Sequence, residues 1–211
     1  SETILESEIL IDVDILNITS ASFARLKNEF YGDISKISSE IISIVNSKGK
    51  YQDPVLGSGG MLIGTVSEIG QKAKEKTLLN KGQRIATLVS LSATPLRIDH
   101  ILKMNLNTDQ VWVKGKAILF EKSLYAVLPE DLSEEIALAV MDVAGAPAIV
   151  AKSVKVGDTV LIVGGGKAGL LSMHEAKKRS GITGKVIVVE KSKERCHNIM
   201  QLGLADQAIT A

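Results

Sequence analysis

Three glycines and one acid carry the clearest chemical signal in the sequence. Gly164, Gly166 and Gly169 follow the spacing GxGxxG, and Glu190 lies 26 positions after the first of them. In a dinucleotide-binding unit the first glycine permits a tight turn, the second lets a pyrophosphate approach the backbone, and the third lets a helix pack closely on a strand. An acid at the position of Glu190 accepts hydrogen bonds from an adenosine ribose. The pattern therefore favours dinucleotide binding over a purely structural unit with an empty crevice.

Two strands and a helix must position these residues. Residues 160–163 form an unbroken apolar run, typical of a strand buried on both faces, and residues 185–189 form a second one. Residues 167–179 predict a helix whose N-terminus offers free N–H groups to phosphates. The residues predicted to bind the cofactor here are Gly164, Gly165, Gly166, Lys167, Ala168, Gly169, Glu190, Lys191 and Arg195.

The same residues indicate which nucleotide is preferred. A carboxylate at Glu190 repels a ribose 2′-phosphate, which favours NAD over NADP. Lys191 and Arg195 can offset that repulsion, so NADP stays possible.

Composition excludes several classes of protein. With 45% hydrophobic and 23% charged residues over 211 positions, the chain has the balance of a soluble globular protein. A net charge of +1 suggests neither nucleic acid nor an anionic membrane as partner. The apolar runs are too short to span a bilayer, and the first residues lack a secretory signal pattern, so we expect a cytoplasmic protein. Cys196 is the only cysteine, which excludes an internal disulfide and a thiolate zinc cluster.

The pattern of elements changes along the chain. Residues 8–16 predict a half-buried strand, residues 17–23 a polar turn, and residues 54–70 a glycine-rich turn followed by a strand. A helix is predicted on the spacing of Ile37, Ile41, Ile42 and Val45, ended by Gly49, and residues 82–91 and 99–128 predict several short strands.

The next segments lead to a domain boundary. Asp131 or Ser133 can cap a helix that runs to about Met141, and residues 142–152 predict a small-residue helix bent or broken at Pro147. After Gly157 strands alternate with helices. We therefore predict an α/β protein with a strand-rich domain over 1–141, a linker helix over 142–156 and a nucleotide-binding domain over 157–211.

The order of these parts, ending in VKVGDTVLIVGGGKAGL, resembles the medium-chain dehydrogenase/reductase superfamily. The resemblance implies a GroES-like catalytic domain, a Rossmann domain (a doubly wound parallel sheet) that is cut short here, and a homodimer in the full-length protein. Residues 59–70 resemble that superfamily's GHExxGxVxxVG segment, with Gly60 and Met61 where zinc enzymes carry His and Glu. No cysteine lies near Asn17, where those enzymes bind zinc. The resemblance implies a member without zinc or another metal.

Five further segments resemble the L-erythro-3,5-diaminohexanoate dehydrogenases of lysine fermentation: LNITSASF, PVLGSGGMLIGTV, ATLVSLSATPL, TDQVWVKGKAILFE and MDVAGAPA. The resemblance implies NAD-dependent oxidative deamination of a small diamino acid. Hydride would leave the carbon that bears the 3-amino group, and hydrolysis of the imine would give 5-amino-3-oxohexanoate and ammonia. Two other functions stay open: a zinc-free quinone or enoyl reductase, and a nucleotide-binding protein without turnover.

Hydride loss from an amine carbon needs a neutral amine and a route for its proton. Thr19 and Ser58 are candidates for that route or for substrate contact, with ordinary turn residues as the alternative. Asp142 or Glu121 could pair with a substrate ammonium; the alternatives are a helix-start carboxylate and a surface charge. By the superfamily resemblance, Ala146 and Pro147 run beside the nicotinamide. His100, His174 and His197 are predicted to be structural.

Overall fold

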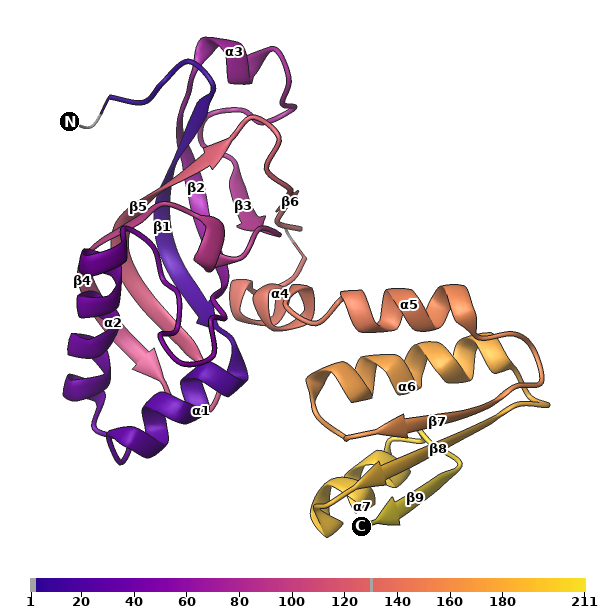
Figure 1. The fold of residues 1–211 in the computed structure, drawn as a ribbon. Coiled ribbons are helices and arrows are strands. Elements are labelled where there is room, and N and C mark those ends of the chain that lie inside the picture. Colours follow the sequence, from indigo (N-terminus) through magenta and orange to yellow (C-terminus); the bar gives the residue numbers. More distant parts are fainter. Residues whose placement is uncertain (1–2, 130) are drawn as a thin grey trace. The chain divides into compact units, whose positions relative to one another are not determined.

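The computed structural model describes residues 3–129 and 131–211, which divide into two compact units, Ser1–Asp142 and Val143–Ala211 (Figure 1). In the described residues, the first unit contains one six-stranded antiparallel sheet in the order β4-β5-β1-β2-β3-β6. Its strands are β1 (Glu8–Ile18), β2 (Gly60–Ile69), β3 (Arg84–Thr87), β4 (Leu96–Asn105), β5 (Gln110–Phe120) and β6 (Tyr125–Val127). Its helices are α1 (Ser20–Glu29), α2 (Ile34–Lys48), α3 (Gln71–Lys74) and α4 (Glu134–Met141), with a 3-10 turn η1 at Leu91–Ala93.

β1 is the central strand, paired with β5 on one side and β2 on the other. Both pairings shift register between Val13 and Ile15, which marks a β-bulge. Because the side chains of a strand alternate, the bulge changes which residues face which core. Ile11 and Val13 before it, and Leu16 after it, pack in the main core, whereas Ile15 packs in a second group. We call this group the cleft-side cluster; it contains Ile15, Met61, Ile63, Ala86 and Leu138, with Trp112, Leu128 and Met141 partly buried against it.

Helix α2 packs along β4 and follows its predicted pattern. Asp33 caps its start by accepting hydrogen bonds from the N–H groups of Ser35 and Lys36. Gly49 ends it in the left-handed conformation, with φ at 66°. Ile37, Ile41 and Val45 are buried as predicted, Ile42 packs partly buried against the core, and Ile44 is buried as well.

Several expectations for the first unit were wrong. Residues 17–23 are not a turn, because β1 continues to Ile18 and α1 begins at Ser20. Residues 99–128 hold three strands, but only β6 is short, because β4 and β5 form a long hairpin; Asp109 adopts a positive φ of 60° just before β5. In 82–91 the strand is limited to β3. The predicted helix that ends at about Met141 is confirmed as α4, and of its two candidate caps Ser133 is the one that caps it.

In its described residues, the second unit contains a parallel sheet in the order β7-β8-β9. Its strands are β7 (Thr159–Val163), β8 (Lys185–Glu190) and β9 (Gln207–Thr210), and its helices are α5 (Gly145–Ser153), α6 (Lys167–Ser180) and α7 (Lys193–Gln201). Met173 and Ala176 of α6 and Ile199 of α7 form one core cluster with the sheet. The α/β class predicted from the sequence is confirmed.

Two expectations for this unit were also wrong. β7 is not buried on both faces: Leu161 is 60% exposed and Val163 80% exposed, because α6 packs against the alternate residues Val160 and Ile162. Pro147 does not break its helix. It lies in the first turn of α5, where its missing N–H is not needed, and the interruption falls earlier, at residues 142–144.

Candidate functional site

The predicted cofactor residues form a glycine loop between β7 and α6. Gly164 has a backbone φ of 98°, which residues other than glycine rarely adopt. Its N–H donates to the carbonyl of Val189 at 2.8 Å. A Cβ at Gly169 would lie 2.0 Å from the carbonyl oxygen of Gly164, so only glycine lets α6 approach β7 this closely. A Cβ at Gly166 would meet nothing within 4 Å. Gly166 is also the N-cap of α6 and provides no side-chain cap. The loop thus leaves open space at a helix N-terminus, which is the arrangement that binds phosphate.

Glu190 at the end of β8 is joined directly to this loop. Its Oε2 accepts a hydrogen bond from the N–H of Gly165 at 2.6 Å, and its Oε1 accepts one from the N–H of Ser192 at 2.9 Å. The side chain is buried, and these two hydrogen bonds, that from Gly165 foremost, lower the pKa of Glu190 below its ordinary value. The carboxylate is therefore charged and fixed. Each of its oxygens can still accept a further hydrogen bond. Sequence reasoning assigned this acid to a ribose but missed its contact with the loop.

Three cations surround the loop and Glu190. The Nζ atom of Lys167, in the first turn of α6, is buried without a hydrogen-bond partner among the described residues. A buried ammonium without a partner is costly, so this atom fits a site that takes a phosphate. Lys191 and Arg195 are exposed and add smaller contributions to the lowered pKa of Glu190. Ala168 lies beside Lys167 in the first turn of α6.

Ala146 and Pro147 lie in the first turn of α5, which packs along α6 (Figure 1). The structure thus places both residues in the same unit as the glycine loop.

The predicted catalytic residues lie in the first unit, around a cavity of about 260 Å³ that we call the Thr19 cleft. Thr19 precedes α1, and Asp142 follows α4 as its C-cap. The expectation that Asp142 starts a helix was therefore wrong, because the carboxylate ends α4 instead. The cleft is lined by Thr19, Gly60, Met61, Leu88, Ser90, Met141 and Asp142.

Ser58 connects Thr19 to a buried hydroxyl. Thr19 Oγ1 and Ser58 Oγ are 2.8 Å apart, and Ser58 Oγ lies 2.6 Å from Ser22 Oγ. Ser22 is fully buried on α1. The three hydroxyls form a chain that begins at the cleft and ends in the protein interior. Sequence reasoning missed Ser22, although its position one helical turn after Thr19 was a usable signal.

A buried ion pair supports the segment that carries Ser58. Asp53 accepts a hydrogen bond from Arg25 Nε at 2.9 Å, and its own N–H donates to the carbonyl of Ser58 at 2.9 Å. Burial alone would raise the pKa of Asp53, but hydrogen bonds from the N–H of Leu56, from Arg25 and from the N–H of Val55 outweigh it and lower that pKa. Neither Arg25 nor Asp53 was singled out from the sequence.

The remaining polar candidates lie elsewhere. Glu121 pairs with Lys76 at 2.8 Å, as expected of a surface charge. His100 lies on β4, His174 on α6 and His197 on α7. Within residues 3–129 and 131–211, no three His, Cys, Asp or Glu side chains gather as a metal site would require.

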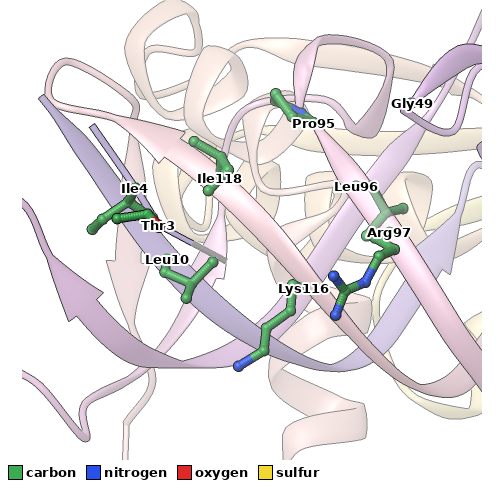
Figure 2. A pocket seen from close by; sticks show the side chains of 9 residues that line it. All are labelled: Thr3, Ile4, Leu10, Gly49, Pro95, Leu96, Arg97, Lys116 and Ile118. Carbon is green, nitrogen blue, oxygen red and sulfur yellow. The ribbon is translucent and has the colours of Figure 1, made fainter. Parts of the chain in front are cut away.

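A second cavity of about 260 Å³ in the first unit contains none of the candidate residues (Figure 2). Its two cations are already paired, Arg97 with Asp99 and Lys116 with Asp12. It is lined by Thr3, Ile4, Leu10, Gly49, Pro95, Leu96, Arg97, Lys116 and Ile118.

In the described part of the chain, no single helix is long and apolar enough to cross a membrane; α4 and α5 satisfy that test only when both are counted together.

Solved structures identify the fold. The chain matches a quinone oxidoreductase of Pseudomonas syringae pv. tomato with a TM-score of 0.59 and 18% identity, over 99% of this chain and 52% of that one. It matches the Escherichia coli quinone oxidoreductase, solved in complex with NADPH, with a TM-score of 0.56 and 17% identity, over 100% of this chain and 52% of that one. The chain therefore shares its fold with these quinone oxidoreductases.

Sequence relatives define the family. Residues 1–129 match the model of the L-erythro-3,5-diaminohexanoate dehydrogenase N-terminal domain. The chain is 51% identical to the L-erythro-3,5-diaminohexanoate dehydrogenase of Acetoanaerobium sticklandii, over 99% of this chain and 61% of that protein. It is 56% identical to the enzyme of the same name from Fusobacterium nucleatum subsp. nucleatum, over 91% of this chain and 56% of that protein. The chain belongs to the L-erythro-3,5-diaminohexanoate dehydrogenase family, and it spans about three fifths of the length of these relatives.

Proposed function

We propose that this protein catalyses the NAD-dependent oxidative deamination of L-erythro-3,5-diaminohexanoate to 5-amino-3-oxohexanoate and ammonia. The observation that carries the proposal is 51% identity to a dehydrogenase of that name over 99% of the chain. The open glycine loop with a fixed carboxylate beside it supports a dinucleotide as the second substrate.

Residues of the second unit can be matched to the pyrophosphate and to the adenosine ribose of NAD. The pyrophosphate would lie at Gly166, where no Cβ intrudes, and Lys167 would supply its unpartnered ammonium to a phosphate. Glu190 would accept hydrogen bonds from the adenosine ribose with the lone pairs that Gly165 and Ser192 leave free. A fixed carboxylate there would also repel a 2′-phosphate, which supports NAD over NADP. Once bound, NAD would accept the hydride.

The residues of the Thr19 cleft would handle the substrate's amine and its proton. The amine must lose a proton before the neighbouring C–H bond can release hydride, since a protonated nitrogen has no lone pair to form the C=N bond. Thr19 could pass that proton to solvent in the open cleft, with its hydroxyl held in place by those of Ser58 and Ser22. Asp142 at the rim could pair with an ammonium group of the substrate.

The atoms of the reaction then balance. The substrate loses hydride from C3 and a proton from its amino nitrogen, which leaves an imine. Water adds to the imine carbon, and ammonia leaves as the carbonyl forms. One molecule each of ketone, ammonia and reduced cofactor, and one proton, result for each molecule of water consumed.

The test uses protein expressed from the complete gene, mixed with NAD and L-erythro-3,5-diaminohexanoate. Reduced cofactor is followed by absorbance and ammonia by a coupled assay, and the two should appear in equal amounts. Reduction without ammonia would exclude a deamination. Intact NAD binding without turnover would favour a quinone or enoyl reductase, tested by NADPH oxidation with those acceptors, or a binding protein if that also fails.

A further inference from the structure

Asn17, near the end of β1, contains an unpaired polar atom inside the first unit. The residue is 1% exposed, and its side-chain oxygen Oδ1 has no hydrogen-bond partner in the described residues. Buried acceptors are nearly always paired in folded proteins, so an unpaired one calls for a specific explanation. A ligand that donates a hydrogen bond supplies one.

Strand register shows which way the Asn17 side chain faces. Asn17 lies directly opposite Met61 in the pairing of β1 with β2, and opposed residues of an antiparallel pair point to the same face of the sheet. Ile15, two residues before Asn17, packs in the cleft-side cluster together with Met61. Met61 in turn lines the Thr19 cleft. The side chain of Asn17 therefore faces the cleft side of the sheet, next to a wall of the cleft.

The apolar side chains around Met61 offer an amine no comparable acceptor. Met61, Met141 and Leu88 give the cleft an apolar lining, while its hydroxyls and Asp142 lie outside β1. An amine that binds in the cleft beside Met61 could therefore donate a hydrogen bond to Asn17 Oδ1 on β1.

We propose that Asn17 recognises the amino group that is oxidised, by accepting a hydrogen bond from its N–H at Oδ1. The inference rests on the proposed function, because it assigns a residue to the amine of that substrate. An uncharged amide suits the task better than a carboxylate. A carboxylate would stabilise the ammonium form, whereas an amide binds the amine without holding it protonated.

The test compares two ligands that differ by this one group. Protein from the complete gene is saturated with NADH, so that no turnover occurs, and titrated calorimetrically with L-erythro-3,5-diaminohexanoate or with 5-aminohexanoate, which lacks the 3-amino group. Asn17→Leu should weaken binding of the diamino acid about tenfold and leave 5-aminohexanoate unchanged. Asn17→Asp, which keeps an acceptor, should bind the diamino acid at least as tightly and reach its maximal kcat at a higher pH than the wild type.

A matched control is Gln110→Leu. Gln110 is a buried amide in the same sheet, opposite Asn17 on β5, but its Nε2 already donates to the carbonyl of Glu135 at 3.1 Å. Its loss should lower Tm without changing the preference between the two ligands.

The outcomes separate this inference from the proposed function. Equal weakening of both ligands by Asn17→Leu, or no change in either, would overturn the role of Asn17. If Asn17→Leu does not fold, an unchanged pH profile in Asn17→Asp overturns it instead. A wild-type protein that prefers the diamino acid through Asn17 but does not reduce NAD would refute the proposed function alone.

Discussion

The carboxylate of Glu190 accepts a hydrogen bond from the backbone N–H of Gly165 at 2.6 Å. The acid that ends β8 thereby holds the loop that follows β7, and the two halves of the GxGxxG…Glu pattern form one unit. Because the two groups lie 25 residues apart in sequence, the contact also fixes the loop relative to the sheet. A substitution at Glu190 is therefore expected to affect both the ribose contact and the shape of the loop.

We expect Glu190→Ala to raise the Kd of NAD about tenfold or more and that of NADP by much less. The reason is that only NAD presents a free 2′-hydroxyl to the carboxylate. Fluorescence titration with NADH and NADPH, which carry the same adenosine ribose groups as NAD and NADP, measures the same discrimination. Asp206→Asn is a matched control, since Asp206 also accepts a backbone hydrogen bond, from Val186 N–H at the other end of β8. Equal weakening of the two cofactors would show that loop anchoring, not ribose recognition, is the role of Glu190.

Two alanine substitutions in the loop should separate cofactor binding from stability. In Gly166→Ala the added methyl group meets open space, so Tm should stay near that of the wild type while NAD affinity falls. In Gly169→Ala the methyl group would overlap the carbonyl of Gly164, which should destabilise the second unit by about 1–3 kcal/mol. Thermal unfolding and NAD titration of both variants check this. A Gly166→Ala protein that binds NAD as well as the wild type would place the pyrophosphate elsewhere.

Thr19→Val should lower kcat about a hundredfold with little change in Tm, because valine keeps the volume but removes the hydroxyl that opens the chain to Ser58 and Ser22. Steady-state kinetics at saturating NAD and diamino acid measure this. Thr19→Ser should retain most of the activity, because the hydroxyl remains. If Thr19→Val kept the wild-type kcat, Thr19 would have no role in proton transfer.

Acid should weaken the first unit through Asp53. A carboxyl whose pKa is lowered by folding stabilises the folded state fully above its unfolded pKa, near 3.8, and loses that contribution as pH falls through the lower folded value. Denaturant unfolding of the wild type should therefore show a loss of stability as pH falls below 3.8 that is missing in Asp53→Asn. At pH 7 the variant should be about 2 kcal/mol less stable, because Arg25 loses its buried partner. Identical pH dependence in both proteins would contradict the assignment.

Local patterns in the sequence predicted much of the fold. Glycine spacing, an apolar run and a helix start sufficed for β7, the loop and α6, and isoleucine spacing with Gly49 sufficed for α2. Predictions failed where tertiary pairing decides. Asn17 and Ile18 look like a polar turn by composition, but β2 and β5 hold Asn17 in β1. β7 looks buried on both faces because apolar runs do not reveal how many helices cover a strand.

The residues of the candidate site also divide into those that the sequence could identify and those that needed the structure. Thr19, Ser58 and Asp142 were identifiable as polar residues in segments of functional interest, but their grouping near one cleft depends on where α1 and α4 begin and end. Asp53 could not be ranked from sequence, since an aspartate is common in loops, and Ser22 had only its spacing from Thr19 as a signal. Only burial and a specific partner distinguish them.

The β-bulge between Val13 and Ile15 has a consequence for how this protein can be engineered or can diverge. If β1 kept all its residues but lost the bulge, strict alternation would turn Leu16 toward the cleft and Asn17 toward the main core. Point substitutions change the cleft one side chain at a time, but inserting or deleting one residue of β1 outside the bulge would exchange the two faces of the strand beyond that point. We expect libraries that vary length in β1 to yield few folded members, while those that vary only side chains on its cleft face stay productive.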